Sequence, residues 1–433
     1  MLALPIANVK DFGAPSDGSS FADRAFQLAM DATQPGGKLY VPYGSYKFEN
    51  PLTFTKPLTL ESHGTFLAAH GKQAIVLPPQ ASGSKITGAY LVCLHSDSDI
   101  DSVGVHLLDS VGVVIENLHT VDFFGYGLLA DDSKDVVVDR FSAAHHYYGG
   151  AMFYSTGNVL VRSSKARDIF GGSTQSAYGF QFTSRRGQGP DHVNATPSWN
   201  CEVLDSEVSD LQWSAFGTHG GSNIRFRRCV ADRCAIGFDI TYLPGDEPDE
   251  DEPPVGFEIT DCEADWGASD RDLAMRGISI SGSPSAPAMG SVTRTRVSRH
   301  GAMNNSNEGA ILTQRTMGVR LTDVTVADPV NYGVTAYLDN QDLLIERPHI
   351  YDVHSPMENA NPIGVELRGG NNQVDVLGGH IHSYLRTPGD WVMLHALRAT
   401  ERMGNRLRYQ GVQFGPTHFA PVSIPVGYGG EIT

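Results

Sequence analysis

The sequence has little that would mark a metalloprotein, a membrane protein or a nucleic-acid-binding protein. Its five cysteines show no CxxC or other metal-ligand spacing. No apolar run approaches the ~20 residues of a membrane-spanning helix, and the first ten residues lack the basic and apolar regions of an export signal. Charged residues make up only 19% of the chain, and the formal net charge is −17. We therefore expect a water-soluble protein that binds neither nucleic acid nor a membrane surface.

What the chain does contain is a repeat. Segments that begin at Gly104, Gly127 and Gly150 align with a period of 23 residues. Each segment is typical of three short strands separated by turns, and apolar residues alternate by two within them. We call these strands one, two and three, with strand one directly after the glycine. The same frame continues to Gly364, so about ten coils are legible.

This pattern predicts an all-β solenoid, because alternation by two and recurrent glycine both oppose helices. Stacked coils bury their inward side chains as continuous ladders. Cys229 and Cys262 occupy one repeat position, which favours apolar stacking in the core over a redox pair. We predict an N-terminal cap over residues 1–50 with a capping helix at 21–32 after Ser19 and Ser20, a β-helix over 51–415, and an extended tail over 416–433.

The regular coils are interrupted by insertions that all flank strand one. The intervals from Gly179 to Cys201 and from Gly237 to Phe257 are the longest between a glycine and the following second strand. Loops that cluster on one face of a rigid scaffold commonly carry binding or catalysis. We therefore predict a walled groove whose floor is strand one; random drift in loop length is the alternative.

Outward positions of strand one supply the candidate floor residues. His219 and Asp239 are the only titratable ones between the large insertions, and they fall on adjacent coils. We expect them close enough for acid and base roles. A surface hydrogen bond without consequence is the other interpretation. Gln181 and Tyr154 occupy equivalent outward positions and are candidate substrate-binding residues.

A second column of polar residues follows strand three. Aspartate recurs there at Asp122, Asp168, Asp210, Asp328 and Asp352. Since aspartate favours turns by bonding its own backbone, we interpret the first and the last two as turn residues. Asp168 and Asp210 lie beside the insertions, so with Asp239 they are candidates for the paired carboxylates that cleave a glycosidic bond.

The insertions themselves carry further candidates. Arg185 and Arg186 suit the carboxylate of an acidic sugar, or they offset the acidic loop at 245–254. That loop is more typical of a solvated charge run than of a Ca²⁺ site, and we expect no cofactor and no metal. The aromatic side chains of Trp213, Tyr242 and Trp266 would stack on sugar rings, or pack as core.

The N-terminal segment carries a family resemblance. The runs NVKDFGA from Asn8, SDG from Ser16 and GGKLYVPYGSY from Gly36 resemble the opening of right-handed, pectate-lyase-superfamily β-helices. That superfamily includes phage tailspike depolymerases, polygalacturonase-like hydrolases and alginate epimerases. Tyr178-Gly179-Phe180 resembles the start of the epimerase site motif, but Gln181-Phe182-Thr183 replaces its Asp-Pro-His. Epimerase and Ca²⁺-dependent lyase residues therefore do not carry over.

Together these observations predict a polysaccharide depolymerase, with hydrolysis favoured over elimination. The candidate catalytic residues are Asp239, Asp210, Asp168 and His219. A lyase or epimerase acting on a uronate polymer would instead use His219 or Tyr154 with an arginine of the insertion. A glycan-binding tail protein without catalysis is a further alternative. The resemblance implies an extracellular or phage-tail-associated protein that assembles as a homotrimer.

Overall fold

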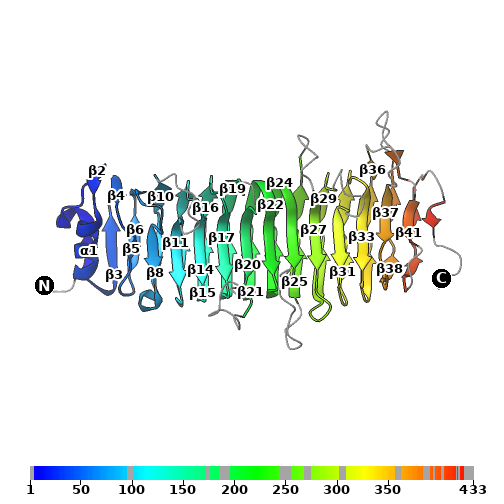
Figure 1. The fold of residues 1–433 in the computed structure, drawn as a ribbon, viewed down its shortest axis with the longest axis horizontal. Helices are drawn as coiled ribbons and strands as arrows, with labels where there is room; N and C mark the ends of the chain where they lie inside the picture. Colours follow the sequence, from blue (N-terminus) through cyan, green and yellow to red (C-terminus); the bar gives the residue numbers. More distant parts are fainter. Residues whose placement is uncertain are drawn as a thin grey trace. The chain divides into compact units, whose positions relative to one another are not determined.

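The computed structural model describes residues 4–94, 102–171, 176–184, 196–242, 255–267, 275–301, 309–355, 362–383, 391–393, 395–400, 404–415, 417 and 420–423. The described chain is nearly all β, with one α-helix, and its long sheets are built from parallel strands (Figure 1). The predicted fold, a right-handed parallel β-helix with a short N-terminal helix, is confirmed. The chain divides into two compact units, residues 1–213 (unit 1) and 214–433 (unit 2).

Unit 1 repeats the three predicted strands coil by coil (Figure 1). Strand one comprises β5 (Leu52–Thr53), β8 (Ile75–Leu77), β11 (Val103–Leu108), β14 (Tyr126–Asp131), β17 (Gly149–Tyr154) and β20 (Tyr178–Thr183). Strand two comprises β1 (Leu4–Asn8), β3 (Thr33–Val41), β6 (Thr59–Ser62), β9 (Lys85–Thr87), β12 (Val114–Glu116), β15 (Lys134–Asp139), β18 (Gly157–Arg162) and β21 (Trp199–Leu204). Strand three comprises β2 (Asp17–Phe21), β4 (Ser45–Phe48), β7 (Thr65–Ala68), β10 (Tyr90–Cys93), β13 (His119–Val121), β16 (Ser142–Ala144), β19 (Lys165–Ile169) and residues 207–213 of β22 (Glu207–His219).

The alternation of apolar residues explains this core. Val136 of β15 pairs in register with Val159 of β18, and both side chains are buried. The rings of Phe153 and Phe182 stack inside the solenoid with centroids 4.9 Å apart. The recurrent glycine is required by close packing, because a Cβ at Gly127 would lie 2.4 Å from Thr120 Oγ1. A larger residue there would force the corner of the coil open.

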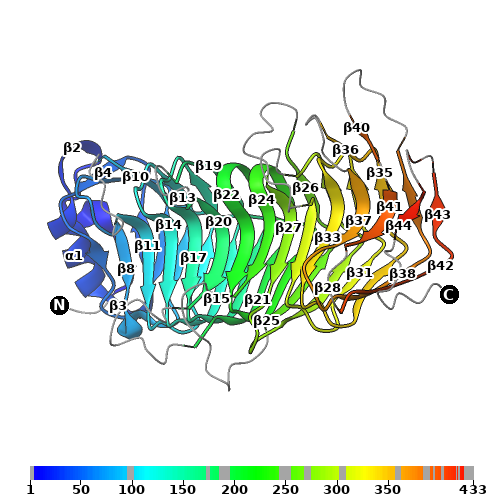
Figure 2. The same cartoon turned by 45° about the vertical axis from the view of Figure 1, so that its right-hand side comes forward.

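The N-terminal end of unit 1 is covered by helix α1 (Asp23–Ala32), seen beside the first strands in Figure 2. Its Phe26 is fully buried and packs edge-on against the rings of Phe48 and Phe66. The prediction of a capping helix is confirmed, but its expected start at Phe21 and its capping by Ser19 and Ser20 are wrong. Strand β2 extends to Phe21, and the N-cap residue is Ala22, which makes no side-chain capping bond. Pairing of β2 with β4 holds those residues extended.

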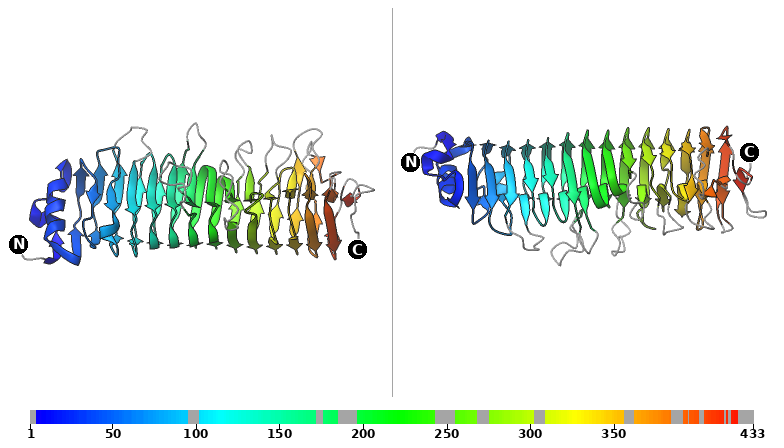
Figure 3. Two further views of the ribbon diagram at one scale, coloured as in Figure 1. Left: turned by 60° about the horizontal axis from the view of Figure 1, so that its bottom comes forward. Right: turned by 90° about the horizontal axis from the view of Figure 1, so that it is seen from above.

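Unit 2 continues the same three-strand coil, and its strands stack in parallel in both views of Figure 3. Strand one comprises residues 214–219 of β22, the end of β24 (Val230–Thr241), β27 (Arg276–Ser281), β30 (Ile311–Gln314), β33 (Tyr332–Leu338), β37 (Ile363–Leu367), β41 (His395–Ala399) and β44 (Val422–Ser423). Strand two comprises β23 (Ser222–Arg227), β25 (Val255–Thr260), β28 (Ala288–Thr293), β31 (Arg320–Thr322), β34 (Leu343–Glu346), β38 (Gln373–Leu377) and β42 (Arg406–Gln410). Strand three comprises the start of β24, β26 (Glu263–Asp265), β29 (Arg296–Ser298), β32 (Thr325–Ala327), β35 (His349–Tyr351), β39 (His380–His382) and β43 (Gln413–Phe414). An antiparallel pair, β36 (His354–Ser355) and β40 (Trp391–Val392), stands apart from the coils' parallel ladders.

The inside of unit 2 combines apolar and polar stacks. Cys229 and Cys262 are buried free thiols on neighbouring coils, and the Cys229 N–H donates to Cys262 Sγ over 3.4 Å. Their predicted role as core stack members is confirmed. Strand β44 lies within the predicted tail yet pairs in parallel with β41, so residues 422–423 join the coil stack. The division at residues 50 and 415 stays a prediction.

A buried histidine makes the stability of unit 1 depend on pH. His146 is fully buried, and Phe123 N–H donates to its Nδ1 over 3.1 Å. Burial lowers the pKa of His146 from 6.5 to about 4. Between those values the unfolded chain binds a proton that the folded chain does not. This contribution to stability is therefore present above pH 6.5 and is lost as pH falls through about 4.

We expect the parent protein to lose up to about 3 kcal/mol more stability than His146→Gln between pH 7 and pH 4. Scanning calorimetry at several pH values measures the difference. Gln80→Asn in the same unit is the control, because this exposed side chain has no titratable group and its replacement should leave the parent's pH dependence unchanged. Equal pH dependence in the parent and His146→Gln would contradict the assignment.

Candidate functional site

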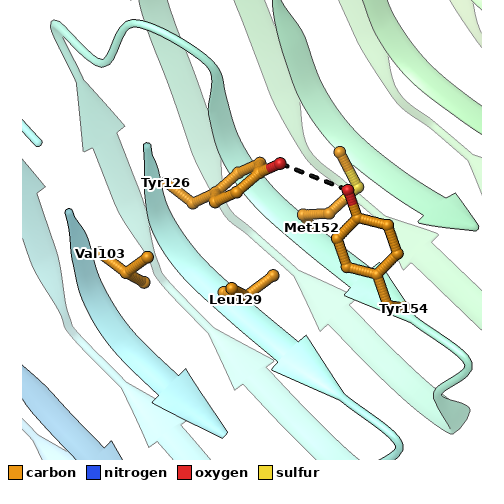
Figure 4. Close-up of a cluster of buried hydrophobic side chains, with 5 residues drawn as sticks. All are labelled: Val103, Tyr126, Leu129, Met152 and Tyr154. Carbon is orange, nitrogen blue, oxygen red and sulfur yellow. Dashed lines mark hydrogen bonds between the residues drawn. The ribbon is translucent and has the colours of Figure 1, made fainter. Parts of the chain in front are cut away.

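The outward face of strand one in unit 1 is covered rather than open. Figure 4 shows side chains from β11, β14 and β17 gathered into one buried cluster, whose members are Val103, Tyr126, Leu129, Met152 and Tyr154. Tyr148 and Tyr178 pack against it. The outward positions predicted as a groove floor are therefore buried in these coils, and the walled groove stays a prediction. Large apolar side chains at outward positions gain more from packing on one another than from lining a wet groove.

Tyr154 belongs to that cluster. Its side chain is 8% exposed, and its hydroxyl lies 3.3 Å from the hydroxyl of Tyr126 (Figure 4). The structure shows this hydroxyl buried and paired, and the contact with sugar and the role as base expected from the sequence stay predictions.

Gln181 continues this outward row on β20. It pairs in register with Met152 and is fully buried. Neither its Oε1 nor its Nε2 has a hydrogen-bond partner among the described residues. An unsatisfied buried amide destabilises the fold by about 1–3 kcal/mol, so such groups are uncommon away from functional sites. The predicted substrate-binding role of Gln181 keeps physical support from this amide.

One buried pair on the same face was missed by the sequence reasoning. His106 Nε2 lies 2.7 Å from Asp131 Oδ2, and both side chains are nearly buried. The residues sit on adjacent coils at the second and fourth positions after the coil glycines. The signal was present in the sequence, because the second and fourth positions after a coil glycine are outward positions of strand one.

The column after strand three is a row of left-handed turns. Asp122, His145, Asp168 and Asp210 all have φ between 54° and 64°. Aspartate tolerates this conformation better than most residues, which confirms the turn interpretation of Asp122. In unit 2, Asp328 and Asp352 have φ values of 51° and 60°, and the same interpretation is confirmed for them.

Asp168 and Asp210 are brought together on neighbouring coils of unit 1. Arg167 pairs with Ser209 and Ile169 with Leu211, so the two aspartates lie opposite each other. Adjacent parallel strands are ~4.8 Å apart. Asp168 Oδ2 also lies 3.5 Å from His145 Nε2. The other ring nitrogen of His145, Nδ1, lies 3.6 Å from Asp122 Oδ1. The result is a partly exposed row of carboxylates joined by one imidazole.

In unit 2, Asp239 is the candidate carboxylate with the most unusual environment. It lies on the outward face of β24, in register with Ser279 of β27, and is 4% exposed. Burial raises its pKa from 3.8 to about 6, although the positive charge of Arg276 and a hydrogen bond from Ser279 oppose the shift. Its Oδ1 has no hydrogen-bond partner among the described residues.

His219 stands at the end of β22. The N–H of its neighbour Gly220 donates to Thr241 O over 2.8 Å. His219 therefore lies beside Thr241, which is two positions after Asp239. Burial lowers the pKa of His219 to about 4. The imidazole is therefore neutral at neutral pH. The sequence placed both residues on adjacent coils of one face, and the structure confirms that arrangement.

The remaining predicted contacts divide between exposure and packing. Trp213 in unit 1 and Tyr242 in unit 2 are partly exposed. Trp266 is buried against Ala235 and Met275, which favours its packing interpretation over sugar stacking. Arg185, Arg186 and the acidic loop at 245–254 lie outside the described residues.

A second buried acid of unit 2 was not predicted. Glu366 on β37 has no exposed side-chain surface, and Arg398 Nε donates to its Oε1 over 3.0 Å. Arg368 donates to the hydroxyl of Tyr332 over 3.0 Å and lies over that ring. Burial raises the pKa of Glu366, and Arg398 opposes that shift. Glu366 occupies an outward position of strand one, so the coil frame would have found it.

Within the described ranges, no helix has the length and apolar character to cross a membrane. The same part of the chain holds no group of three or more His, Cys, Asp or Glu side chains placed to bind a metal ion.

Comparison with known proteins supports the resemblance and the fold. The family model "Rhamnogalacturonase A/epimerase, pectate lyase-like" matches residues 6–69. Mannuronan C5-epimerase AlgE4 of Azotobacter vinelandii is 30% identical over 168 residues, which cover 37% of this chain and 30% of the epimerase. The match thus spans less than a third of that relative's length. The predicted resemblance to pectate-lyase-like β-helices is confirmed.

Two solved structures share the fold at low sequence identity. The catalytic domain of a GH87 alpha-1,3-glucanase, solved with tetrasaccharides, has a TM-score of 0.55 and 12% identity; the match covers 94% of this chain and 65% of that one. The catalytic unit of a GH87 alpha-1,3-glucanase from Streptomyces thermodiastaticus has a TM-score of 0.52 and 15% identity over 98% of this chain and 69% of that one. Both likenesses concern the β-helix itself.

Proposed function

We propose that this protein cleaves polysaccharides, that it is a glycoside hydrolase, and that Asp239 is its catalytic acid. The observation that carries the proposal is the environment of this carboxyl group. It is buried, one of its oxygens has no hydrogen-bond partner in the part of the chain that the structure describes, and its pKa is raised to about 6. A carboxylic acid that keeps its proton in mildly acidic solution is suited to protonate the leaving oxygen of a glycosidic bond.

The chemistry requires a second group. Glycosidases pair the acid with a carboxylate that acts as nucleophile or activates water. Asp168 and Asp210 of unit 1, which lie opposite each other on adjacent coils, are a separate candidate pair of carboxylates. Neutral His219 is the candidate partner in unit 2, since an imidazole with its pKa lowered to about 4 can accept a proton. Separate Asp→Asn substitutions at 168 and 210 test that pair.

Similarity to known proteins supports a polysaccharide as the substrate. The matching family model describes rhamnogalacturonase and epimerase proteins, and the curated relative is named for its action on mannuronan. Both names refer to polymers of sugars.

The resemblance to phage tailspikes extends the proposal to an extracellular or phage-tail-associated protein that assembles as a homotrimer. A monomer in sedimentation equilibrium would contradict the homotrimer.

The test is incubation of the purified protein with a panel of bacterial capsular, exopolysaccharide and plant polysaccharides. Reducing ends and near-ultraviolet absorbance are read together. We expect new reducing ends without absorbance, because hydrolysis creates no double bond. Reducing ends accompanied by absorbance would show elimination and overturn the hydrolase. Silence across a panel that includes a bound glycan would leave a binding protein.

The second candidate function is elimination or epimerisation on a uronate polymer. Its specific support is the 30% identity to the mannuronan epimerase over part of the chain. The candidate bases for it are His219 and Tyr154. A changed uronic acid composition without new chain ends would show epimerisation.

A further inference from the structure

A corner of unit 1 carries aromatic side chains at one repeat position that no role above uses. In three successive coils, the residue two places after the left-handed turn is Phe124, Tyr147 or Phe170. The turn residues before them are Asp122, His145 and Asp168, respectively. We call these six residues the corner ridge.

The ridge is held in order by the backbone. Tyr147 N–H donates to Phe123 O over 3.4 Å, and Phe170 N–H donates to His146 O over 3.1 Å. The rings of Phe124 and Tyr147 stack with centroids 4.1 Å apart and an interplanar angle of 15°. Each coil therefore contributes one aromatic residue to the row, and successive aromatic positions are one strand spacing apart.

Phe170 departs from the stack. Its side chain is 51% exposed, and among the described residues it has no ring partner. An exposed phenylalanine at the end of an aromatic row leaves a ring face open to solvent. Such a face is a favourable contact for a flat, partly apolar ligand.

The charges beside the rings limit the chemistry of that ligand. Asp122 and Asp168 are exposed or partly exposed carboxylates, and Asp210 follows them on the next coil. Ionised carboxylates only accept hydrogen bonds, so they suit hydroxyl donors and repel carboxylates or sulfates. Arg167 lies 3.7 Å from Asp168, which offsets part of this charge. The whole chain carries a net charge of −17, which opposes polyanions further.

We propose that the corner ridge binds a segment of uncharged polysaccharide. A sugar ring stacks its C–H face on Phe170, the edge of the Phe124–Tyr147 stack extends the apolar contact, and the neighbouring aspartates accept hydrogen bonds from sugar hydroxyls. The strand spacing lets consecutive sugar residues follow consecutive coils. This inference rests on the proposed action on polysaccharide and specifies its substrate as uncharged.

Affinity electrophoresis tests the ridge in gels that contain uncharged polysaccharides or polymers bearing carboxyl groups. We expect the parent to be retarded by an uncharged polymer, and Phe170→Ala to bind it about tenfold more weakly. Phe170→Trp should retain binding, because it keeps a ring face. Tyr43→Ala is the matched control, since Tyr43 is 77% exposed and lies in the N-terminal cap. Thermal melting confirms that each variant is folded.

Three outcomes would overturn the proposal that the corner ridge binds uncharged polysaccharide. They are retardation by carboxylated polymers alone, absence of any retardation, and equal binding by Phe170→Ala and the parent. The assay is independent of cleavage. Binding that depends on Phe170 without release of reducing ends would support the ridge and contradict the enzyme. Cleavage by a protein whose binding does not depend on Phe170 would support the enzyme and contradict the ridge.

Discussion

Replacement of Asp239 by asparagine is expected to lower kcat about a hundredfold or more on whichever polysaccharide the parent cleaves. General acid catalysis contributes about 10²–10⁴-fold to such reactions, and an amide cannot donate the required proton. The parent's rate should also fall as pH rises through about 6, because the acid then ionises. Initial rates of reducing-end release over a pH series measure both effects.

The matched control is Asp323→Asn in the same unit. Asp323 is exposed and hydrogen-bonded to Arg347, and asparagine tolerates its left-handed backbone conformation. We expect parental kcat and parental pH dependence from this variant. If Asp239→Asn kept kcat within a few-fold of the parent, Asp239 would not be the acid.

The same substitution separates a functional carboxyl from a structural one. The folded pKa of Asp239 lies above its unfolded value of 3.8, so the folded chain binds the extra proton between 3.8 and about 6. This contribution to stability is present below pH 3.8 and is lost as pH rises through about 6. Relative to the parent, Asp239→Asn should therefore be up to about 3 kcal/mol more stable at pH 8 than at low pH. A variant that loses activity while gaining stability at pH 8 would mark a group kept for chemistry.

Replacement of Asn372 by alanine is expected to destabilise unit 2 by about 3–4 kcal/mol. Asn372 is buried between Asn340 and Asn405 of neighbouring coils. Its Oδ1 accepts from Asn340 Nδ2 over 2.7 Å, and its Nδ2 donates to Asn405 Oδ1 over 3.0 Å and to Arg368 O over 2.6 Å. Its Oδ1 also accepts from the Asn340 N–H over 3.3 Å. Alanine removes all four bonds and leaves Arg368 O without that donor.

Denaturant unfolding measures the loss, and the exposed neighbour Asn371 supplies the control. Asn371 makes one side-chain bond to Asp339 and has φ of 59°, so its change to alanine should cost about 1 kcal/mol. A loss at Asn372 no larger than that at Asn371 would show that the internal ladder adds little to stability. Because the chain has two compact units, two transitions are fitted where they separate.

The sequence by itself determined the coil. Its recurrent glycines and its alternation of apolar residues fixed the strand order, the inward residues and the turn positions, since those depend on local sterics and on the period of side chains along a strand. The left-handed aspartates and the stacked cysteines followed from the same frame. The corner ridge was legible in principle as well, because Phe124, Tyr147 and Phe170 recur with the coil period.

Only the tertiary structure decided which outward residues meet water. Tyr154 faces outward in the coil frame and Trp266 was a candidate for stacking on sugars, yet neighbouring aromatic and apolar side chains bury both. The raised pKa of Asp239 and the unpaired amide of Gln181 likewise depend on what surrounds them in space. Burial is a sum over neighbours that are distant in the sequence, and a repeat pattern specifies the direction of a side chain but not what covers it.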